Sequence, residues 1–318
     1  MADFWKGKSA FVAGNHFAAP WLARELAERG ADVVMLMPDF PNETYSLFGL
    51  GKKVSCARGS TACFRNVERT LNEYEVDSVF LVGNEVRSRK AVEVLEGKVM
   101  VGWKVLEACR VSKLVERIVV GSSYRAYDEK ARLPYTESAA LAGSAPEGIS
   151  AACVDLLANS YNVTYGLPIG IARFGSLYGG GELNFDRLIP GAIKSVLKKQ
   201  RPVVRGKGEQ VRDYLYVEDA VKAYLKLAQA LEKRRVWGEA FNFGTGKPVK
   251  VGEVVEKILK AGKSKAKPKI LNRKLNSVDE RIMKVSKAKK LGWRADYALE
   301  SGLKESVKWY RNLFKKRG

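Results

Sequence analysis

The chain has 318 residues, of which 46% are hydrophobic, and its 56 Lys and Arg against 35 Asp and Glu give a formal net charge of +21. A chain of this length and composition can bury a substantial core, which excludes a largely disordered protein and predicts one large or two modest domains. No run of about 18 apolar residues occurs, so we expect no membrane-spanning helix. The N-terminus, MADFWKGKSAFVAGN, does not resemble a signal peptide. Four cysteines without a CxxC pair and a single histidine argue against a disulfide framework and a zinc cluster, so we predict no metal site and a reduced, cytoplasmic setting.

The positive charge is confined to the second part of the chain. Residues 1–186 carry 21 Lys and Arg against 22 Asp and Glu, a net charge of −1, whereas residues 187–318 carry 35 against 13, a net charge of +22. Such a split indicates a polyanion-binding surface in the C-terminal part. A Lys-rich surface of the thermophile type is the alternative, and the composition leaves both open.

Short apolar runs alternate with helical patterns in the first half of the chain. The runs predict buried strands, and the segments with apolar residues three and four apart predict helices. Alternation at this spacing predicts a parallel sheet with helices on both faces. The expected strands are 9–14, 31–37, 78–82, 117–121 and 168–174, and the expected helices are 21–29, 63–74, 99–109 and 150–161.

The pattern changes in the second half to helices separated by short β segments. We expect β segments at 202–205 and 212–216 and a final helix at 299–314. The segment 260–274 is the most linker-like part of the chain, because it is basic, contains a proline and has few large apolar residues.

Together the elements predict an α/β protein with a Rossmann-type, doubly wound parallel sheet. We place the Rossmann-type, NAD(P)-binding-like domain at residues 1–175. A smaller, basic α/β lobe of the substrate-binding type follows at 176–318, with the chain partly interwoven between the two.

The turn after the first predicted strand is where a dinucleotide would bind. Such a fold needs glycines there, for a tight turn and for close approach of the pyrophosphate to backbone N–H groups. Only Gly14 is present, and Phe17 and Pro20 stand where the second and third glycines belong. The benzyl group of Phe17 would occupy space that the pyrophosphate needs, which predicts a weakened or absent NAD(P) site; a loop that swings Phe17 outward and keeps Gly14 in use is the alternative. Asp39, after the second strand, stands where an acid would bind the ribose, or it caps the loop.

Several further motifs follow one another in an order typical of one family. They are GSS at 121–123 with Tyr127, LPYTES at 133–138, RF at 173–174, DRLIP at 186–190, RDYLYVED at 212–219, FNFGTG at 241–246 and SKAKKLGW at 286–293. With these motifs the chain resembles the extended short-chain dehydrogenase/reductases of the NAD-dependent nucleotide-sugar epimerase/dehydratase family. Its opening segments, FWKGKSAFVAG and WLARELAERGADVV, and the later SLF resemble the CDP-glucose 4,6-dehydratase branch in particular. The resemblance runs nearly end to end and implies NAD(P) as cofactor and a nucleotide-sugar as substrate.

The resemblance also implies where the catalytic residues should stand. In the family a Tyr is the general base, its pKa is lowered by a Lys four residues later, and a Ser or Thr shares its hydrogen bond. Ser123 retains the Ser/Thr position, whereas Glu147 replaces the Tyr and Ala151 replaces the Lys. None of the 13 tyrosines is followed by a Lys four residues later, so we do not expect the family reaction. Glu147 as a new base for a redox-free elimination or hydrolysis and Glu147 as a solvated loop residue both remain open.

The family residues that hold the nucleotide diphosphate are better retained. Arg212 resembles a diphosphate-binding Arg, Arg281 lies where a second one is often found, and Arg187 is a third candidate for anion binding. Arginine suits this task because its guanidinium group donates two parallel hydrogen bonds. The alternative is that Arg212 pairs with one of the acids that follow it in the motif.

The sequence therefore predicts a catalytically degenerate homologue of the nucleotide-sugar epimerases and dehydratases, a pseudoenzyme. Its expected partner is anionic, either a nucleotide or nucleotide-sugar or a nucleic acid or ribonucleoprotein, bound through the basic lobe. The competing hypothesis is an active NAD-dependent nucleotide-sugar dehydratase or epimerase with altered catalytic residues. The resemblance further implies a homodimer, formed through the predicted helices near 98–109 and 150–161.

Overall fold

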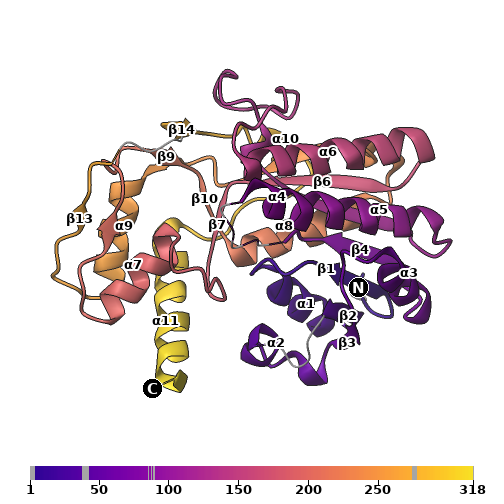
Figure 1. Ribbon diagram of the computed structural model, residues 1–318, viewed down its shortest axis with the longest axis horizontal. Helices are drawn as coiled ribbons and strands as arrows, with labels where there is room; N and C mark the ends of the chain where they lie inside the picture. Colours follow the sequence, from indigo (N-terminus) through magenta and orange to yellow (C-terminus); the bar gives the residue numbers. More distant parts are fainter. Residues whose placement is uncertain are drawn as a thin grey trace.

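The computed structural model describes residues 4–37, 43–84, 86, 88, 90–273 and 278–317. Its centre is a seven-stranded sheet with the order β11-β6-β5-β4-β1-β2-β3, in which every neighbouring pair is parallel. Helices flank this sheet on both sides, and a smaller lobe lies at one end of it (Figure 1). The predicted Rossmann-type α/β fold is therefore confirmed.

The strands of the main sheet are mostly continuous apolar runs, because a parallel sheet covered on both faces buries both sets of side chains. The exception is β3 at the sheet edge, where Ala57 is the one buried residue, and the sequence pattern does not predict this strand. The seven strands are β1 (Ser9–Ala13), β2 (Asp32–Met37), β3 (Ser55–Arg58), β4 (Ser78–Leu81), β5 (Arg117–Ser123), β6 (Ile169–Phe174) and β11 (Ala240–Phe243).

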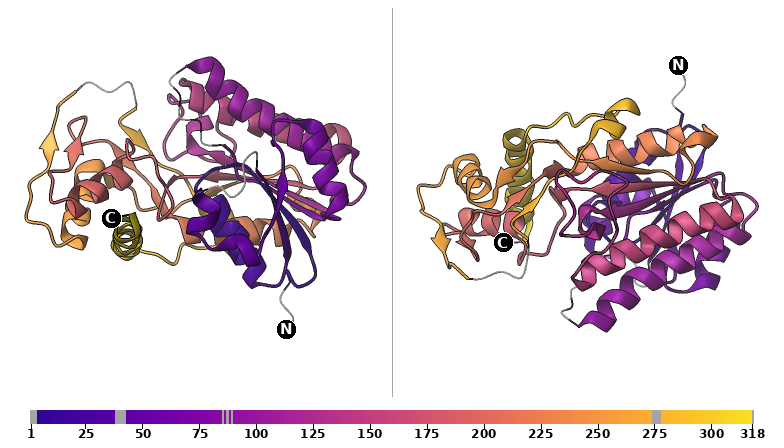
Figure 2. Two further views of the ribbon diagram at one scale, coloured as in Figure 1. Left: turned by 60° about the horizontal axis from the view of Figure 1, so that its bottom comes forward. Right: turned by 90° about the horizontal axis from the view of Figure 1, so that it is seen from above.

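Two hydrophobic cores lie on the two faces of this sheet. Successive strand residues point to opposite faces, so that Val12 packs into the core beneath α1 and α8 and Phe11 into the core beneath α3, α5 and α6. Figure 2 shows α5 and α6 side by side on their face of the sheet. The flanking helices are α1 (Ala19–Glu28), α3 (Phe64–Glu73), α4 (Ala91–Leu95), the π-helical turn η2 (Glu96–Met100), α5 (Val101–Val111), α6 (Pro146–Tyr165) and α8 (Val217–Ala230).

The C-terminal lobe consists of three packed helices, α7 (Leu188–Leu197), α9 (Val251–Ala261) and α11 (Leu299–Arg317), with short strands around them. The segment expected to be linker-like contains the end of α9 and β13, which pairs with β8, so its described part belongs to the lobe. Residue 274 lies outside the described residues. The remaining elements are α2 (Glu43–Leu47), η1 (Leu50–Lys52), η3 (Tyr124–Ala126), β7 (Ser176–Tyr178), β8 (Val203–Val204), β9 (Val211–Arg212), β10 (Tyr214–Tyr216), η4 (Arg234–Val236), β12 (Val249–Lys250), β13 (Lys269–Ile270), β14 (Glu280–Arg281) and α10 (Ser286–Lys290).

The two halves of the chain share the main sheet. Strand β11 and helix α8 come from the second half and complete the sheet and its cover, and the boundary at residue 175 stays a prediction. No helix among the described residues is both long enough and apolar enough to cross a membrane.

Candidate functional site

A cleft of about 870 Å³ opens at the carboxyl ends of the central strands, between the sheet and the C-terminal lobe. Strand order reverses between β1 and β4, and ligands of open α/β sheets bind at such a reversal. The sheet side of the cleft is formed by the ends of β4, β5 and β6 and the first turns of α6, and the lobe side by α7, β8 and β9. Predicted site residues that line it are Ser123, Glu147, Ala151, Arg187 and Arg212.

The loop after β1 is fastened to the loop after β4. Gly14 has a φ of +114°, and a Cβ added to it would lie 2.2 Å from the carbonyl oxygen of Gly83. The N–H of His16 donates to that same oxygen at 3.2 Å, and the N–H of Asn15 donates to Asn84 Oδ1 at 3.1 Å. Gly14 therefore permits a close approach of two backbone segments, and it is not among the residues that line the cleft.

At the start of α1, too, backbone N–H groups donate to acceptors within the protein. The N–H of Ala18 donates to His16 Nδ1 at 3.3 Å, and the N–H of Ala19 donates to the carbonyl of His16 at 2.8 Å. The next residue, Pro20, has no N–H to donate. The N–H groups of residues 15, 16, 18 and 19 thus donate to protein acceptors, whereas an anion bound at a helix N-terminus needs such donors exposed.

Phe17 does not fill the cleft, contrary to the expectation from its position. Its side chain is 3% exposed and packs in the larger core with Ala18 and Trp21. The physical reason is that a benzyl group gains more from burial against the sheet than from contact with a solvated cleft. Asp39, the expected ribose-binding acid, lies outside the described residues.

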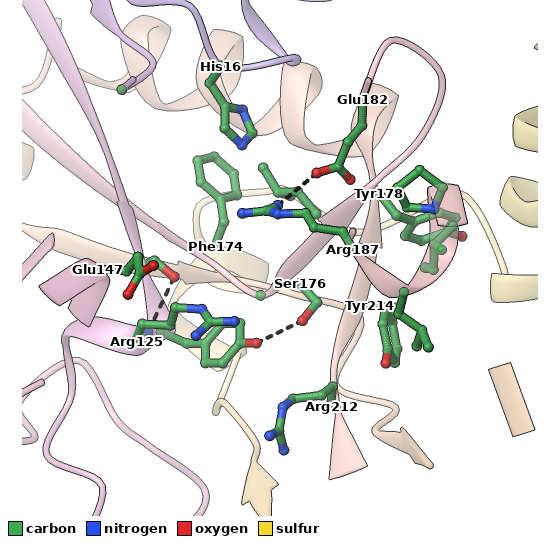
Figure 3. A pocket seen from close by; sticks show the side chains of 18 of the residues that line it. His16, Arg125, Glu147, Phe174, Ser176, Tyr178, Glu182, Arg187, Arg212 and Tyr214 are labelled. Carbon is green, nitrogen blue, oxygen red and sulfur yellow. Dashed lines mark hydrogen bonds and ion pairs between the residues drawn. The ribbon is translucent and has the colours of Figure 1, made fainter. Parts of the chain in front are cut away.

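His16 lines the cleft in place of Phe17, and its ring points toward Phe174 and Arg187 (Figure 3). Burial, together with the positive charges of Arg187 and Lys98, lowers the pKa of His16 to about 3, so the imidazole is neutral at physiological pH. Because Nδ1 accepts the N–H of Ala18, the neutral ring carries its proton on Nε2.

The residues in place of the family Tyr and Lys both lie at the start of α6. Pro146 occupies the first turn of this helix, where its missing N–H costs nothing, and Glu147 is an exposed acid in the same turn, where the helix dipole favours negative charge. Glu147 is therefore a helical residue rather than a loop residue. Ser123, at the end of β5, accepts the N–H of Arg125 at 3.2 Å and caps the short helix η3.

Tyr124 and Arg125 are cleft residues that the sequence motifs do not single out. The Tyr124 ring is 4% exposed, and its hydroxyl lies 2.7 Å from Ser176 Oγ. Burial by itself would raise the pKa of Tyr124, but the charge of Arg125, the Ser176 hydrogen bond and two further guanidinium groups outweigh it, and the pKa is lowered. Their position directly after a central strand of a parallel sheet is the signal that could have indicated them.

The two expected diphosphate-binding arginines have structural partners. Arg212 donates from Nη1 to the carbonyls of Val211 (2.7 Å) and Asp279 (2.9 Å) and from Nη2 to the carbonyl of Val278 (2.8 Å), so its described partners are backbone carbonyls and not the neighbouring acids. Arg281 is 5% exposed, forms an ion pair with Glu129 and does not line the cleft.

Two other arginines on the lobe side face the cleft. Arg187 pairs with Glu182 at 3.0 Å, and Glu182 is 2% exposed (Figure 3). Arg205, which the motifs do not indicate, pairs with Asp186 at 3.2 Å, and both side chains are well exposed. The cleft therefore has a cationic wall that solvent can reach.

The model of the NAD dependent epimerase/dehydratase family matches residues 12–244. The chain belongs to this family. Among its relatives, the CDP-glucose 4,6-dehydratase of Salmonella typhimurium is 25% identical over 97% of this chain and 92% of its own length. A trifunctional UDP-glucose 4,6-dehydratase, epimerase and reductase of Arabidopsis thaliana is 32% identical over 65% of this chain, which spans 31% of that longer protein.

Solved structures of epimerases and dehydratases share the fold. The UDP-glucose 4-epimerase of Thermotoga maritima, solved with UDP-glucose, has a TM-score of 0.84 at 22% identity and covers 96% of this chain and 99% of its own. The dTDP-glucose 4,6-dehydratase of Bacillus anthracis, solved with NAD, has a TM-score of 0.82 at 22% identity over 96% of this chain and 97% of its own. The fold of this epimerase/dehydratase family member is thus that of its structural neighbours.

Proposed function

We propose that this chain binds a nucleotide or nucleotide-sugar in the cleft without the NAD-dependent hydride transfer of its family. Family membership supports the ligand class, and a neighbour of the same fold holds UDP-glucose. The observation that carries the second part is the closed loop after β1, whose N–H groups at residues 15, 16, 18 and 19 all donate to protein acceptors.

NAD(P), the cofactor that the family implies, does not fit this loop. Its pyrophosphate would need backbone donors that are aimed into the cleft, and opening them would break the hydrogen bonds to Gly83 and Asn84. The chain also lacks the tyrosine–lysine pair that would take the sugar hydroxyl proton as hydride leaves. Both losses affect hydride transfer between the sugar and NAD(P), so a bound cofactor would lack the residues needed for this step.

The lobe side of the cleft suits a diphosphate. Arg187 and Arg205 present guanidinium groups there, and Arg212 uses three of its five N–H donors on backbone carbonyls, which leaves two. Guanidinium groups bind phosphate oxygens through charge-assisted, often paired hydrogen bonds. The ligand would therefore lie with its diphosphate toward the lobe and its sugar toward Ser123 and Tyr124.

Calorimetry with CDP-glucose, UDP-glucose, NAD⁺ and NADH tests this proposal. We expect a nucleotide-sugar to bind and NAD(H) to give no heat of binding at millimolar concentration. Micromolar affinity for NAD(H) would contradict the proposal that the protein does not use NAD(P). Failure of every nucleotide tested to bind would contradict the proposal that its ligand is a nucleotide or nucleotide-sugar.

A pair of arginine variants tests where the diphosphate lies. Arg205→Gln removes a cleft guanidinium whose ion pair is exposed, and it should weaken nucleotide-sugar binding about tenfold, the effect of losing one charge-assisted hydrogen bond of about 1.5 kcal/mol. Arg294→Gln removes an exposed arginine outside the cleft and should leave the affinity unchanged. Equal affinities of the two variants would contradict this placement.

A second candidate function, electrostatic binding of RNA, is favoured by one segment of the lobe. Lysines 263, 265, 267 and 269 are all exposed and alternate with half-buried residues. Lys263 lies in the turn after α9, and the other three lead into β13, where an extended backbone would space them at intervals of about 6.6 Å. None of the four forms an ion pair with another described residue. A row of unpaired cations on an extended backbone is a surface that a phosphate chain can follow.

Fluorescence anisotropy with a single-stranded RNA at several salt concentrations tests the second candidate. Replacing the four lysines by Gln should reduce the salt slope, by up to about 3 in a plot of log K against log salt. Replacing Lys304, Lys308, Lys315 and Lys316 of α11 makes the same change in charge in the same lobe and should have less effect. No binding at ~50 mM salt, or equal effects of the two sets, would contradict this role of the segment.

A further inference from the structure

The cleft contains a buried tyrosine that ligand binding alone does not require. Tyr124 lies at the carboxyl end of β5, with its hydroxyl on Ser176 Oγ at 2.7 Å, and both residues line the cleft. We propose that Tyr124 is the acid–base group of the cleft and exchanges a proton with a carbon next to a carbonyl group in a bound nucleotide keto-sugar. The inference rests on the proposed function in that the ligand must occupy the cleft.

Charged groups from three elements surround the Tyr124 phenol. Arg125 follows it in η3, Arg212 comes from β9, and the Arg281 guanidinium of β14 lies 5.5 Å from the ring centroid. Arg281 is itself paired with Glu129, whereas Arg125 has no ion pair with any described acid. Three guanidinium groups thus lie around a buried phenol. That of Arg125 is exposed at the cleft and has no ion pair with a described acid.

This arrangement favours the charged form of the phenol. A tyrosine ordinarily loses its proton near pH 10, and burial alone would make that loss harder. The positive charges and the Ser176 hydrogen bond outweigh burial and lower the pKa of Tyr124. Tyr214 provides a contrast in the same cleft, because burial and the neighbouring Tyr124 raise its pKa. Titratable groups with shifted pKa values in a cleft are candidates for acid–base work.

The chemistry open to such a base without a hydride acceptor is proton transfer. The Tyr124 phenolate oxygen takes a proton from the carbon next to the carbonyl, the C–H electron pair forms the carbon–carbon double bond, and the carbonyl becomes an enolate. Arg125 is placed to donate a hydrogen bond to the enolate oxygen, as a fixed cation does for a developing negative charge. Return of the proton to the same carbon restores the sugar, and the step neither consumes nor releases electrons.

The substrate must therefore carry a carbonyl. An ordinary sugar C–H is far too weak an acid for a phenolate, whereas a C–H next to a carbonyl is acidified because its conjugate base is an enolate. The nucleotide diphosphate would be held by the arginines on the lobe side, which leaves the sugar ring beside Tyr124.

Hydrogen–deuterium exchange tests this inference directly. The protein is incubated with UDP-4-keto-6-deoxy-D-glucose in D₂O, and loss of the protons on the carbons next to the carbonyl is followed by NMR, while calorimetry measures binding of the same compound. We expect the wild-type protein to catalyse exchange, with a rate that rises with pH as Tyr124 ionises. Tyr124→Phe should slow exchange at least 100-fold, the range seen for loss of a general base, and change affinity less than threefold.

Further variants separate a proton-transfer role from a structural one. Arg125→Gln should slow exchange about tenfold or more and shift its pH profile to higher pH, because a positive charge beside the phenol is lost. Tyr165→Phe, on the exposed end of α6, should behave as the wild type. Should Tyr124→Phe fail to fold, Ser176→Ala keeps the ring and should slow exchange while raising the pH at which it sets in.

The outcomes distinguish this inference from the function on which it rests. Binding without exchange by the wild-type protein overturns the role of Tyr124 and leaves the proposed nucleotide-sugar binding intact. Exchange that persists in Tyr124→Phe also overturns it. Failure of every nucleotide and keto-sugar to bind overturns the proposed function, and the inference with it.

Discussion

His16 is the only histidine in the chain, and the fold keeps it neutral beside two cations. The unfolded chain binds this proton near pH 6.5 and the folded chain only near pH 3, so the unfolded state holds more protons between these values. Stability should therefore be fully present above pH 6.5 and fall as the pH drops, by at most about 1.4 kcal/mol per pH unit from this residue. Urea unfolding between pH 7.5 and 4.5 measures the loss.

The matched variant for this prediction is His16→Gln, which cannot titrate. The difference in unfolding free energy between the wild-type protein and His16→Gln should change with pH below 6.5 and stay constant above it. Because the chain has one imidazole, its NMR signals give an independent check. A midpoint near 6.5 in the folded protein would contradict the lowered pKa of His16.

Gly14 and Gly83 form a matched pair for testing the contact between their loops. Both have positive φ, +114° and +89°, so Ala is strained at either position. A Cβ on Gly14 would also lie 2.2 Å from the Gly83 carbonyl oxygen, whereas a Cβ on Gly83 meets nothing within 4 Å. We expect Gly83→Ala to cost about 1 kcal/mol and Gly14→Ala at least about 3 kcal/mol of unfolding free energy. Equal losses in urea denaturation would show that the backbone contact contributes nothing.

At the scale of single residues, the sequence predicts some of the side chains that line the cleft and misses others. Ser123, Glu147 and Ala151 reach the cleft as the family register implies. Phe17 does not, because the direction of its side chain depends on how the loop turns into α1. Arg205, directly after β8, reaches the cleft although none of the family motifs covers it.

Helix α6 and strand β6 are joined by a buried ion pair between Asp155 (2% exposed) and Arg173 (6% exposed). Arg173 donates in addition to the Tyr127 hydroxyl at 3.0 Å and to the Glu137 carbonyl at 2.7 Å, so the pair also holds the chain that follows β5. Its charged partners raise the pKa of Arg173 against the effect of burial, which opposes the charge. The pair therefore couples two elements of the main domain to one loop.

Removing the acid of this pair should destabilise the protein strongly. Asp155→Asn leaves a buried guanidinium without its counter-charge, and we expect a loss of about 3 kcal/mol or more in unfolding free energy. The control is Glu107→Gln on α5, whose pair with Arg110 is partly exposed and should contribute less than about 1 kcal/mol. Chemical denaturation compares the two, and losses of similar size would mean that water reaches Arg173.

Strands are predicted correctly where burial produces a run of apolar residues in the sequence, and they are missed where it does not. The apolar runs of β1, β2, β4, β5 and β6 are confirmed as central strands, because both faces of each are covered. Strand β3 escapes prediction because it lies at the sheet edge with one buried residue. In the second half of the chain, β8 and β10 lie within the β segments expected at 202–205 and 212–216. Strands β12 and β14, which the sequence does not predict, are set by contacts between distant segments, since both pair with β9.

At the scale of the whole molecule, one face carries most of the exposed apolar surface. Nine of the eleven large apolar side chains exposed in the described part of the chain lie between residues 92 and 165, on and around α4, α5 and α6. Ile149, Leu156 and Val163 are seven residues apart and so form a stripe along α6, and Trp103 of α5 is 44% exposed. Exposed patches of this kind mark interaction sites, and a two-fold axis would pair the patch with its copy.

We therefore expect a homodimer through α5 and α6. Sedimentation velocity should give a dimer for the wild-type protein and a monomer for Leu156→Glu or Trp103→Glu, because each places a charge in the interface. Val203→Glu, which alters an exposed apolar residue of the lobe, should stay dimeric. A monomeric wild-type protein, or a dimer that survives both helix variants, would refute this interface.

The contact between the loops after β1 and β4 bears on how the family's ancestral activity could be regained. Two of its components, the Gly14 approach to Gly83 and the hydrogen bond from His16 to the same carbonyl, are made by the main chain. Substituting glycines at residues 17 and 20 would restore the glycine-rich motif in the sequence, but it would leave both of these backbone contacts in place. Under the proposed function, regaining NAD binding would require a change in backbone path, which neither of these substitutions supplies, and this makes the proposed loss hard to reverse by evolution or by protein engineering.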